Sequence, residues 1–233
     1  MSMDWCNILI DDLWQLIFSF GHRSEQILWT AEILNKAIQT EKLDDLYVDA
    51  IKHHLEEILY TLHKKHQIKF SVTTMHIFAR KGHLEYLKWA HANGCLWNEY
   101  ICSDAAENGH LEVLQWAHDN GCPWHEYTCA TAAFNGHLEV LKWARSNGCP
   151  WDTSTCAFAA LNGHLEVLKW ARENKCPWNE DTCSRAALNG HLEVLQWARA
   201  NGCPWDGKTC RAAKDNGHLE VLKWARENKC PEL

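Results

Sequence analysis

The stretch Thr155–Trp178 reads TCAFAALNGHLEVLKWARENKCPW, and close copies of it recur along the chain at a constant spacing of 27 residues. The tetrapeptide Gly-His-Leu-Glu marks this period and begins at Gly82, Gly109, Gly136, Gly163, Gly190 and Gly217. A fixed period of roughly 20 to 50 residues is typical of proteins built from stacked repeats, in which each unit contacts only its neighbours. The spacing therefore predicts a solenoid, and a solenoid usually works by binding rather than by chemistry.

One copy of the repeat reads as two short helices joined by a tight turn. Thr155 is the predicted N-cap of the first helix, because its hydroxyl can accept a hydrogen bond from a free backbone N–H. Asn162-Gly163 ends that helix, since both residues tolerate the left-handed conformation, and His164 opens the second. Apolar residues cover most of the second helix, namely Leu165, Val167, Leu168, Trp170 and Ala171. Such a helix needs neighbours on both flanks, so the fold class is all-α, an α-solenoid of helix-turn-helix units.

Residues that keep one position in every copy are most simply packing residues. Small side chains on the first helix allow close helix approach; they are Ala105, Ala132, Ala159, Ala186 and Ala213. Lys175 and Lys229 replace the glycine that ends the second helix in the other copies. We expect both lysines to adopt the left-handed conformation at a cost of about 1 kcal/mol each.

Composition narrows the class of protein. The chain has 233 residues and a formal charge of −7, which does not favour nucleic-acid binding. No run of 18 apolar residues predicts a membrane span, and Met1–Asp12 does not read as a secretory signal. Twelve cysteines without such a signal favour a reducing, intracellular compartment, the cytoplasm. We expect no membrane, no nucleic-acid partner and no cofactor.

Cysteine and histidine recur once or twice per unit and invite a metal or catalytic reading. Pairs such as Cys149 and Cys156 lack the usual zinc spacing, and equivalent residues of neighbouring repeats should lie about 10 Å apart, too far to share an ion. Oxidation of a pair within one repeat stays open if its Cα atoms lie within about 7 Å. The Gly-His histidines fit a hydrogen bond that locks the turn. No nucleophile–base pair stands out, so we predict neither metal nor enzyme.

The repeat resembles the ankyrin repeat in the segment Ala186–Val194, which reads AALNGHLEV. The resemblance extends from about Thr74 to Cys230. Two features depart from it: the unit is shorter than the usual ankyrin length of about 33 residues, and the Thr-Pro-Leu-His opening is reduced to Thr-Cys, as at Thr128-Cys129. The shortfall lies at Cys-Pro-Trp, where ankyrin repeats project a β-hairpin. The chain is similar to hairpin-less arrays abundant in large DNA viruses of amoebae, which would place it in the host cytoplasm.

Positions that differ between copies are candidates for partner binding. The residues two and three places past the threonine vary, and ankyrin-like stacks expose the start of the first helix on their concave face. Aromatic and arginine side chains are the usual anchors of an interface. The predicted partner-binding residues are Tyr100, Asp104, Tyr127, Thr131, Phe158, Arg185 and Arg211. Neutral variation on a solvated face is the alternative for any one of them. The function implied is a protein–protein interaction scaffold.

Residues 1–73 do not share the period and form a predicted helical head, followed by six repeats over 74–233. Leu9–Phe20, which reads LIDDLWQLIFSF, resembles the first helix of an F-box, although Ile10 stands where proline is usual. An F-box docks on the Skp adaptor of a cullin ubiquitin ligase. The resemblance implies adaptor contacts by Leu13, Trp14, Ile17 and Phe18, and a substrate-adaptor function as the alternative. The other interpretation is a plain cap over the first repeat.

Overall fold

The computed structural model describes residues 71–232, and these residues form helices and no strand. They belong to two compact units, one with residues 71–78 and 83–97 and the other with residues 79–82 and 98–232. The predicted all-α solenoid of helix-turn-helix units is confirmed, whereas residues 1–70 of the predicted head lie outside the described residues. The helices are α5 (Val72–Lys81), α6 (Leu84–Ala92), α7 (Tyr100–Glu107), α8 (Leu111–Asp119), α9 (Glu126–Phe134), α10 (Leu138–Ser146), α11 (Thr153–Leu161), α12 (Leu165–Glu173), α13 (Glu180–Leu188), α14 (Leu192–Ala200), α15 (Gly207–Asp215) and α16 (Leu219–Glu227).

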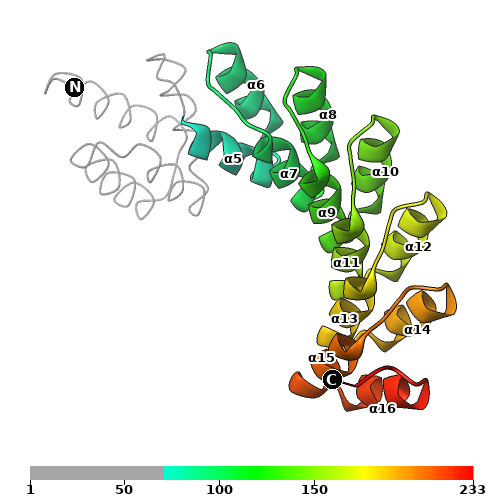
Figure 1. Ribbon diagram of the computed structural model, residues 1–233. Coiled ribbons are helices and arrows are strands. Elements are labelled where there is room, and N and C mark those ends of the chain that lie inside the picture. The colour runs from blue at the N-terminus through cyan, green and yellow to red at the C-terminus, as the bar shows by residue number, and fades with distance from the viewer. Residues whose placement is uncertain (1–70, 233) are drawn as a thin grey trace, which may run out of the picture. The chain divides into compact units, whose positions relative to one another are not determined.

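The second unit is a curved double row of helices. The first helices of its repeats, α7, α9, α11, α13 and α15, follow one another along the inner side of the curve, and the second helices fan outward (Figure 1). Successive first helices approach closely, and no two successive second helices of this unit come as close. Side-chain size explains the difference, because the first helices meet through fully buried alanines such as Ala159 and Ala186. On the outer row, the tryptophan of a second helix meets the preceding loop tryptophan edge to face, as Trp197 meets Trp178 at 6.0 Å.

Each first helix begins earlier than the sequence predicts, so Thr155 as N-cap is wrong. Helix α11 starts at Thr153, and the carboxylate of Asp152 accepts a hydrogen bond of 2.9 Å from the Ser154 backbone N–H. Asn179 and Asp206 cap α13 and α15 in the same way, and His125 caps α9 through Nδ1. Thr155 itself is fully buried within the helix, and its hydroxyl has no hydrogen-bond partner in the described structure. The cap varies among Asp, Asn and His, which hides it from a search for identical residues.

The Gly-His pair joins one repeat to the next. The glycines adopt positive φ, which ends each first helix as predicted. The expected hydrogen bond of the histidine exists, but its partner lies in the preceding repeat: Nε2–H of His110 donates to the Arg80 carbonyl at 2.9 Å, and that of His218 to the Leu188 carbonyl at 3.0 Å. The ring also fills the space above the preceding glycine, since a Cβ on Gly190 would lie 2.5 Å from His218 Nδ1.

His164 is neutral where it joins two repeats. Burial lowers the pKa of His164 below its ordinary value of 6.5, against the opposing effect of a hydrogen bond with the Phe134 carbonyl. The imidazole therefore carries no charge at neutral pH. This state suits a structural joint better than a general base or a metal ligand, because the Nε2 atom is already engaged.

The second helices end as the sequence predicts. Lys175 and Lys229 adopt positive φ values of 67° and 62°, at the position that glycine takes in the other described repeats. The Asn side chain before each of them donates to a carbonyl one turn back, as Asn174 does to Trp170 at 2.8 Å. This bond satisfies a terminal carbonyl and offsets part of the strain.

The revised cap assignment makes a testable prediction. Asp152→Ala should lower the free energy of unfolding by about 1 kcal/mol, because Ser154 N–H loses its acceptor. Thr155→Val should leave it unchanged or raise it, because the substitution removes a buried hydroxyl without a partner and keeps the shape. Urea denaturation of the two variants measures both values. A large loss for Thr155→Val with none for Asp152→Ala would restore Thr155 as the cap.

The joint between repeats makes a second prediction, with a matched pair of glycines. Gly190 and Gly217 have φ values of 76° and 75°, but a Cβ at Gly217 meets nothing within 4 Å. Gly217→Ala should cost about 1 kcal/mol from backbone strain alone, whereas Gly190→Ala should cost about 2–3 kcal/mol, because it also displaces His218 and breaks its hydrogen bond. Denaturation midpoints measure the difference. In a His218→Ala background the two alanine substitutions should cost the same, and an excess that persisted there would contradict the joint.

Candidate protein-binding face

One stripe of each first helix in the second unit carries residues that differ between repeats and that, apart from the buried Asp104, are exposed or half-buried in most positions. Its residues are spaced i, i+4 and i+7, which places them on one stripe. We refer to these stripes together as the first-helix face. From α7 to α15 its residues are Tyr100, Asp104 and Glu107; Tyr127, Thr131 and Phe134; Ser154, Phe158 and Leu161; Asp181, Arg185 and Leu188; and Lys208, Ala212 and Asp215. The face runs along the row of helices that forms the inner side of the curve (Figure 1).

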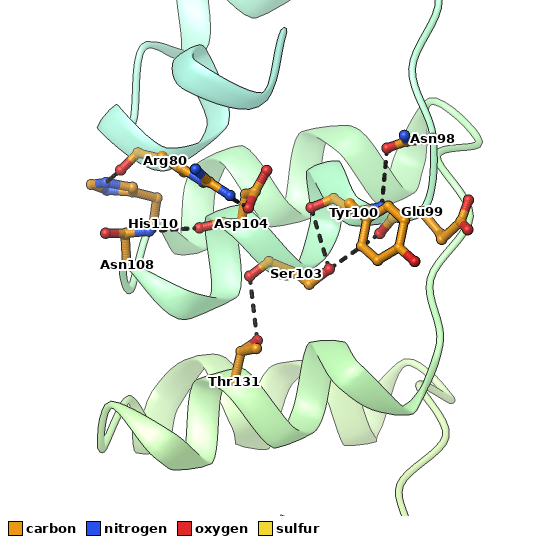
Figure 2. A network of polar contacts seen from close by, with 9 residues as sticks. All are labelled: Arg80, Asn98, Glu99, Tyr100, Ser103, Asp104, Asn108, His110 and Thr131. Atoms are coloured by element: carbon orange, nitrogen blue, oxygen red, sulfur yellow. Dashed lines mark hydrogen bonds and ion pairs between the residues drawn. The ribbon is translucent and has the colours of Figure 1, made fainter. Parts of the chain in front are cut away.

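The polar groups at the start of this face are satisfied by the array itself. Asp104 is only 5% exposed, and its carboxylate accepts a charge-assisted hydrogen bond of 2.9 Å from Arg80 Nε. The hydroxyl of Thr131 lies 2.9 Å from the Tyr127 carbonyl and 3.3 Å from the Ser103 carbonyl of the preceding repeat (Figure 2). The prediction that the start of every first helix is exposed is therefore wrong for Ser103 and Asp104, because both residues pack against the neighbouring repeat.

The middle of the face is apolar and carries one cation. The rings of Phe134 and Phe158, from successive repeats, meet edge to face at 5.8 Å. The guanidinium of Arg185 lies over the Phe158 ring, 5.1 Å from its centroid. The structure thus brings together two of the predicted residues, Phe158 and Arg185, and all three side chains are half-buried.

Two tyrosines stand out at the edge of the face. Tyr100 and Tyr127 are 52% and 55% exposed. The His125 ring lies edge-on to both, 5.6 Å from Tyr100 and 5.4 Å from Tyr127. The three rings form an exposed aromatic cluster where α7 and α9 begin.

Arg211 lies apart from the contact between Phe158 and Arg185. In the three preceding repeats its position holds Ala130, Ala157 and Ser184, of which the two alanines are buried. Arg211 is instead exposed beside a pocket of about 280 Å³ between α15 and α16, with Lys214, Asp215 and Leu222 in its lining. Arg211 differs from its counterparts, as the sequence indicated, but it does not lie on the first-helix face.

The sequence reasoning missed a ladder of stacked side chains on the second helices. Arg172 lies over the Trp178 ring at 4.0 Å, and Trp178 meets Trp197 of the next repeat edge to face at 6.0 Å. Arg145 and Arg199 repeat this arrangement with Trp151 and Trp205. Each of these arginines also donates to the carbonyl of the cysteine four residues later. The sequence carried a signal for this ladder, because an Arg recurs six residues before a Trp.

The cysteines contact each other in a different pairing from the one considered above. Cys102 and Cys122, 20 residues apart in one repeat, are in contact: the Cys102 thiol donates to the Cys122 backbone carbonyl at 3.9 Å, and the Cys122 thiol donates to the Asn98 carbonyl at 3.4 Å. The same interaction pairs Cys129 with Cys149. The hydrogen bond and burial raise the pKa of Cys102 well above its ordinary range. At the last described repeat, burial and the contact with Cys210 raise the pKa of Cys230 to about 12. Among residues 71–232, no group of three His, Cys, Asp or Glu side chains is placed to hold a metal ion.

Thiol reactivity tests this arrangement. The eleven described cysteines are buried, and a raised pKa lowers the fraction of reactive thiolate. In a Cys6→Ser variant at pH 8, we expect an aromatic disulfide reagent to label the native array far more slowly than the array in guanidinium. Peptide mapping by mass spectrometry identifies the labelled residue. Rapid labelling of Cys102 or Cys129 in the native protein would contradict the burial of these pairs.

Two further features bear on the predicted partners. The expected adaptor residues Leu13, Trp14, Ile17 and Phe18 lie outside the described residues, so the F-box resemblance stays a prediction. In the part of the chain that the structure describes, every helix is too short or too polar to cross a bilayer.

Comparisons with known proteins agree with this geometry. Residues 129–172 match the family model described as ankyrin repeats (many copies). The structure is similar to that of the human ASB11 ankyrin repeat domain, with a TM-score of 0.54 at 16% sequence identity, over 67% of this chain and 83% of that one. A search of curated protein sequences gave no match. The segment 129–172 thus consists of ankyrin repeats, and the array built on the same 27-residue unit has the ankyrin-repeat fold.

Proposed function

We propose that the protein is a non-enzymatic interaction scaffold that binds a protein partner through its first-helix face. Ankyrin repeats generally mediate protein–protein interaction, and the specific face is our assignment. The main observation behind this proposal is where the residues that differ between repeats lie. The repeats share their glycines, histidines, alanines and tryptophans, whereas the three positions of the first-helix stripe hold unlike residues from one repeat to the next.

The chemistry of this face supports the proposal. Exposed tyrosines, an edge-to-face phenylalanine pair and a stacked arginine are the side chains that dominate the energy of protein interfaces. Large aromatic side chains lose little conformational entropy when a partner covers them. The side chains of Phe134 and Phe158 are further restrained by their mutual contact, so this part of the surface is preorganised.

Site-specific photocrosslinking tests the assignment of the face. The full chain with benzoylphenylalanine in place of Tyr127 should capture a protein partner, because this side chain is 55% exposed on the first-helix face. The same probe in place of Lys223, whose side chain is 78% exposed on a second helix, is the matched control and should capture little. Mass spectrometry identifies the adduct.

The captured protein, once purified, then provides a quantitative readout. Phe158→Ala should weaken its binding by about tenfold or more, since a truncated aromatic anchor typically costs at least about 1–2 kcal/mol. Lys142→Ala, on a second helix, should leave the affinity unchanged. Two outcomes would place the partner on another surface: capture only with the probe in place of Lys223, or a loss of affinity with Lys142→Ala equal to that with Phe158→Ala.

A further inference from the structure

We infer that the partner segment carries a carboxylate side chain and an apolar side chain about three residues apart, and that Arg185 is the receptor of the carboxylate. This inference rests on the proposed function and adds the chemical class of the ligand. It follows from which cation of the first-helix face already has a carboxylate partner within the array and which does not.

Arg185 differs in this respect from Lys208, the other cation of the face. Asp104 is paired with Arg80 at 2.9 Å, and Lys208 has the Asp206 carboxylate 3.9 Å away. Among residues 71–232, no carboxylate lies within ion-pairing distance of Arg185, and its recorded contact is with the Phe158 ring. A half-buried guanidinium without a carboxylate keeps its planar fork of donors available for two parallel hydrogen bonds.

The surroundings of Arg185 favour a carboxylate as the ligand. Stacking on Phe158 holds the guanidinium plane and removes water from one of its faces, so less conformational entropy is lost when the fork binds. The next repeat places Ala212 at the position of Arg185, and this small side chain leaves room beside the cation. A carboxylate would neutralise the charge and satisfy the donors together, which a hydroxyl or carbonyl group cannot do.

An apolar side chain of the same segment would lie toward the preceding repeats. Phe134, Phe158 and Leu161 form the apolar part of the face there. Leu161 and Arg185 occupy the same positions in their two repeats as Phe134 and Phe158 do in theirs. Neighbouring helices are about 8–10 Å apart, and an extended chain advances about 3.3 Å per residue. One step between repeats therefore corresponds to about three residues of an extended peptide, which sets the spacing of the two side chains.

A peptide library displayed on phage and selected against the full chain tests this inference without knowledge of the natural partner. We expect the selected random dodecapeptides to share Asp or Glu about three residues from a large apolar residue. Binding of a synthetic peptide with this pattern should fall by at least about tenfold with Arg185→Glu, the loss expected for a charge-assisted pair. Replacing its acidic residue by Lys should restore binding to the Arg185→Glu variant.

The control and the remaining outcomes separate the two proposals. Arg211→Glu reverses an exposed cation in the end pocket and should leave peptide binding unchanged, while melting temperatures verify the folding of each variant. Peptides that require Phe158 but no acidic residue would overturn this inference and leave the proposed function standing. Peptides insensitive to both Phe158→Ala and Arg185→Glu would count against both, and a library that yields no binder would overturn the carboxylate pattern alone.

Discussion

The hydrogen bond from the repeat histidine to a carbonyl of the preceding repeat, present at His110, His137 and His218, is the contact on which the array depends. It spans 30 residues of sequence, as from His110 to Arg80, and it fixes how one helix pair sits on the next. The joint also requires glycine on the other side, because the imidazole occupies the space where a Cβ would be. A neutral histidine that donates through Nε2 meets this need at ordinary pH, in keeping with the lowered pKa of His164.

A joint made of backbone, glycine and histidine leaves the rest of the first helix free to vary. Buried alanines bring the first helices together, whereas on the outer row the tryptophans of the second helices meet the loop tryptophans edge to face. The Arg–Trp ladder and the Cys–Cys contacts strengthen each unit without using the first-helix face. Binding residues can therefore change from repeat to repeat while the frame stays constant.

The two halves of the first-helix face serve different purposes. In the first half, Arg80 and Asp104 neutralise each other, and Thr131 bonds back to the preceding repeat. Like the hydrogen bonds of the histidines, these contacts join neighbouring repeats. In the second half, the guanidinium of Arg185 is held over the Phe158 ring, and no carboxylate among residues 71–232 pairs with it. Under the proposed function, a carboxylate of the partner would pair with Arg185, whereas Asp104 already has its partner in Arg80.

The repeat, the two helices of each unit, the turn glycines and the close approach at the alanines could be predicted from the sequence alone, because each depends on neighbours in the chain or on the period. The sequence also indicated Phe158 and Arg185 as exceptions to the pattern. The packing of one repeat on the next was needed to show that Thr155 is buried while Asp152 caps the helix, that Asp104 is an internal ion-pair partner, and that Cys102 contacts Cys122. These facts depend on which side of a helix faces the next repeat, and a period of 27 residues fixes the repetition of that side without revealing which side it is.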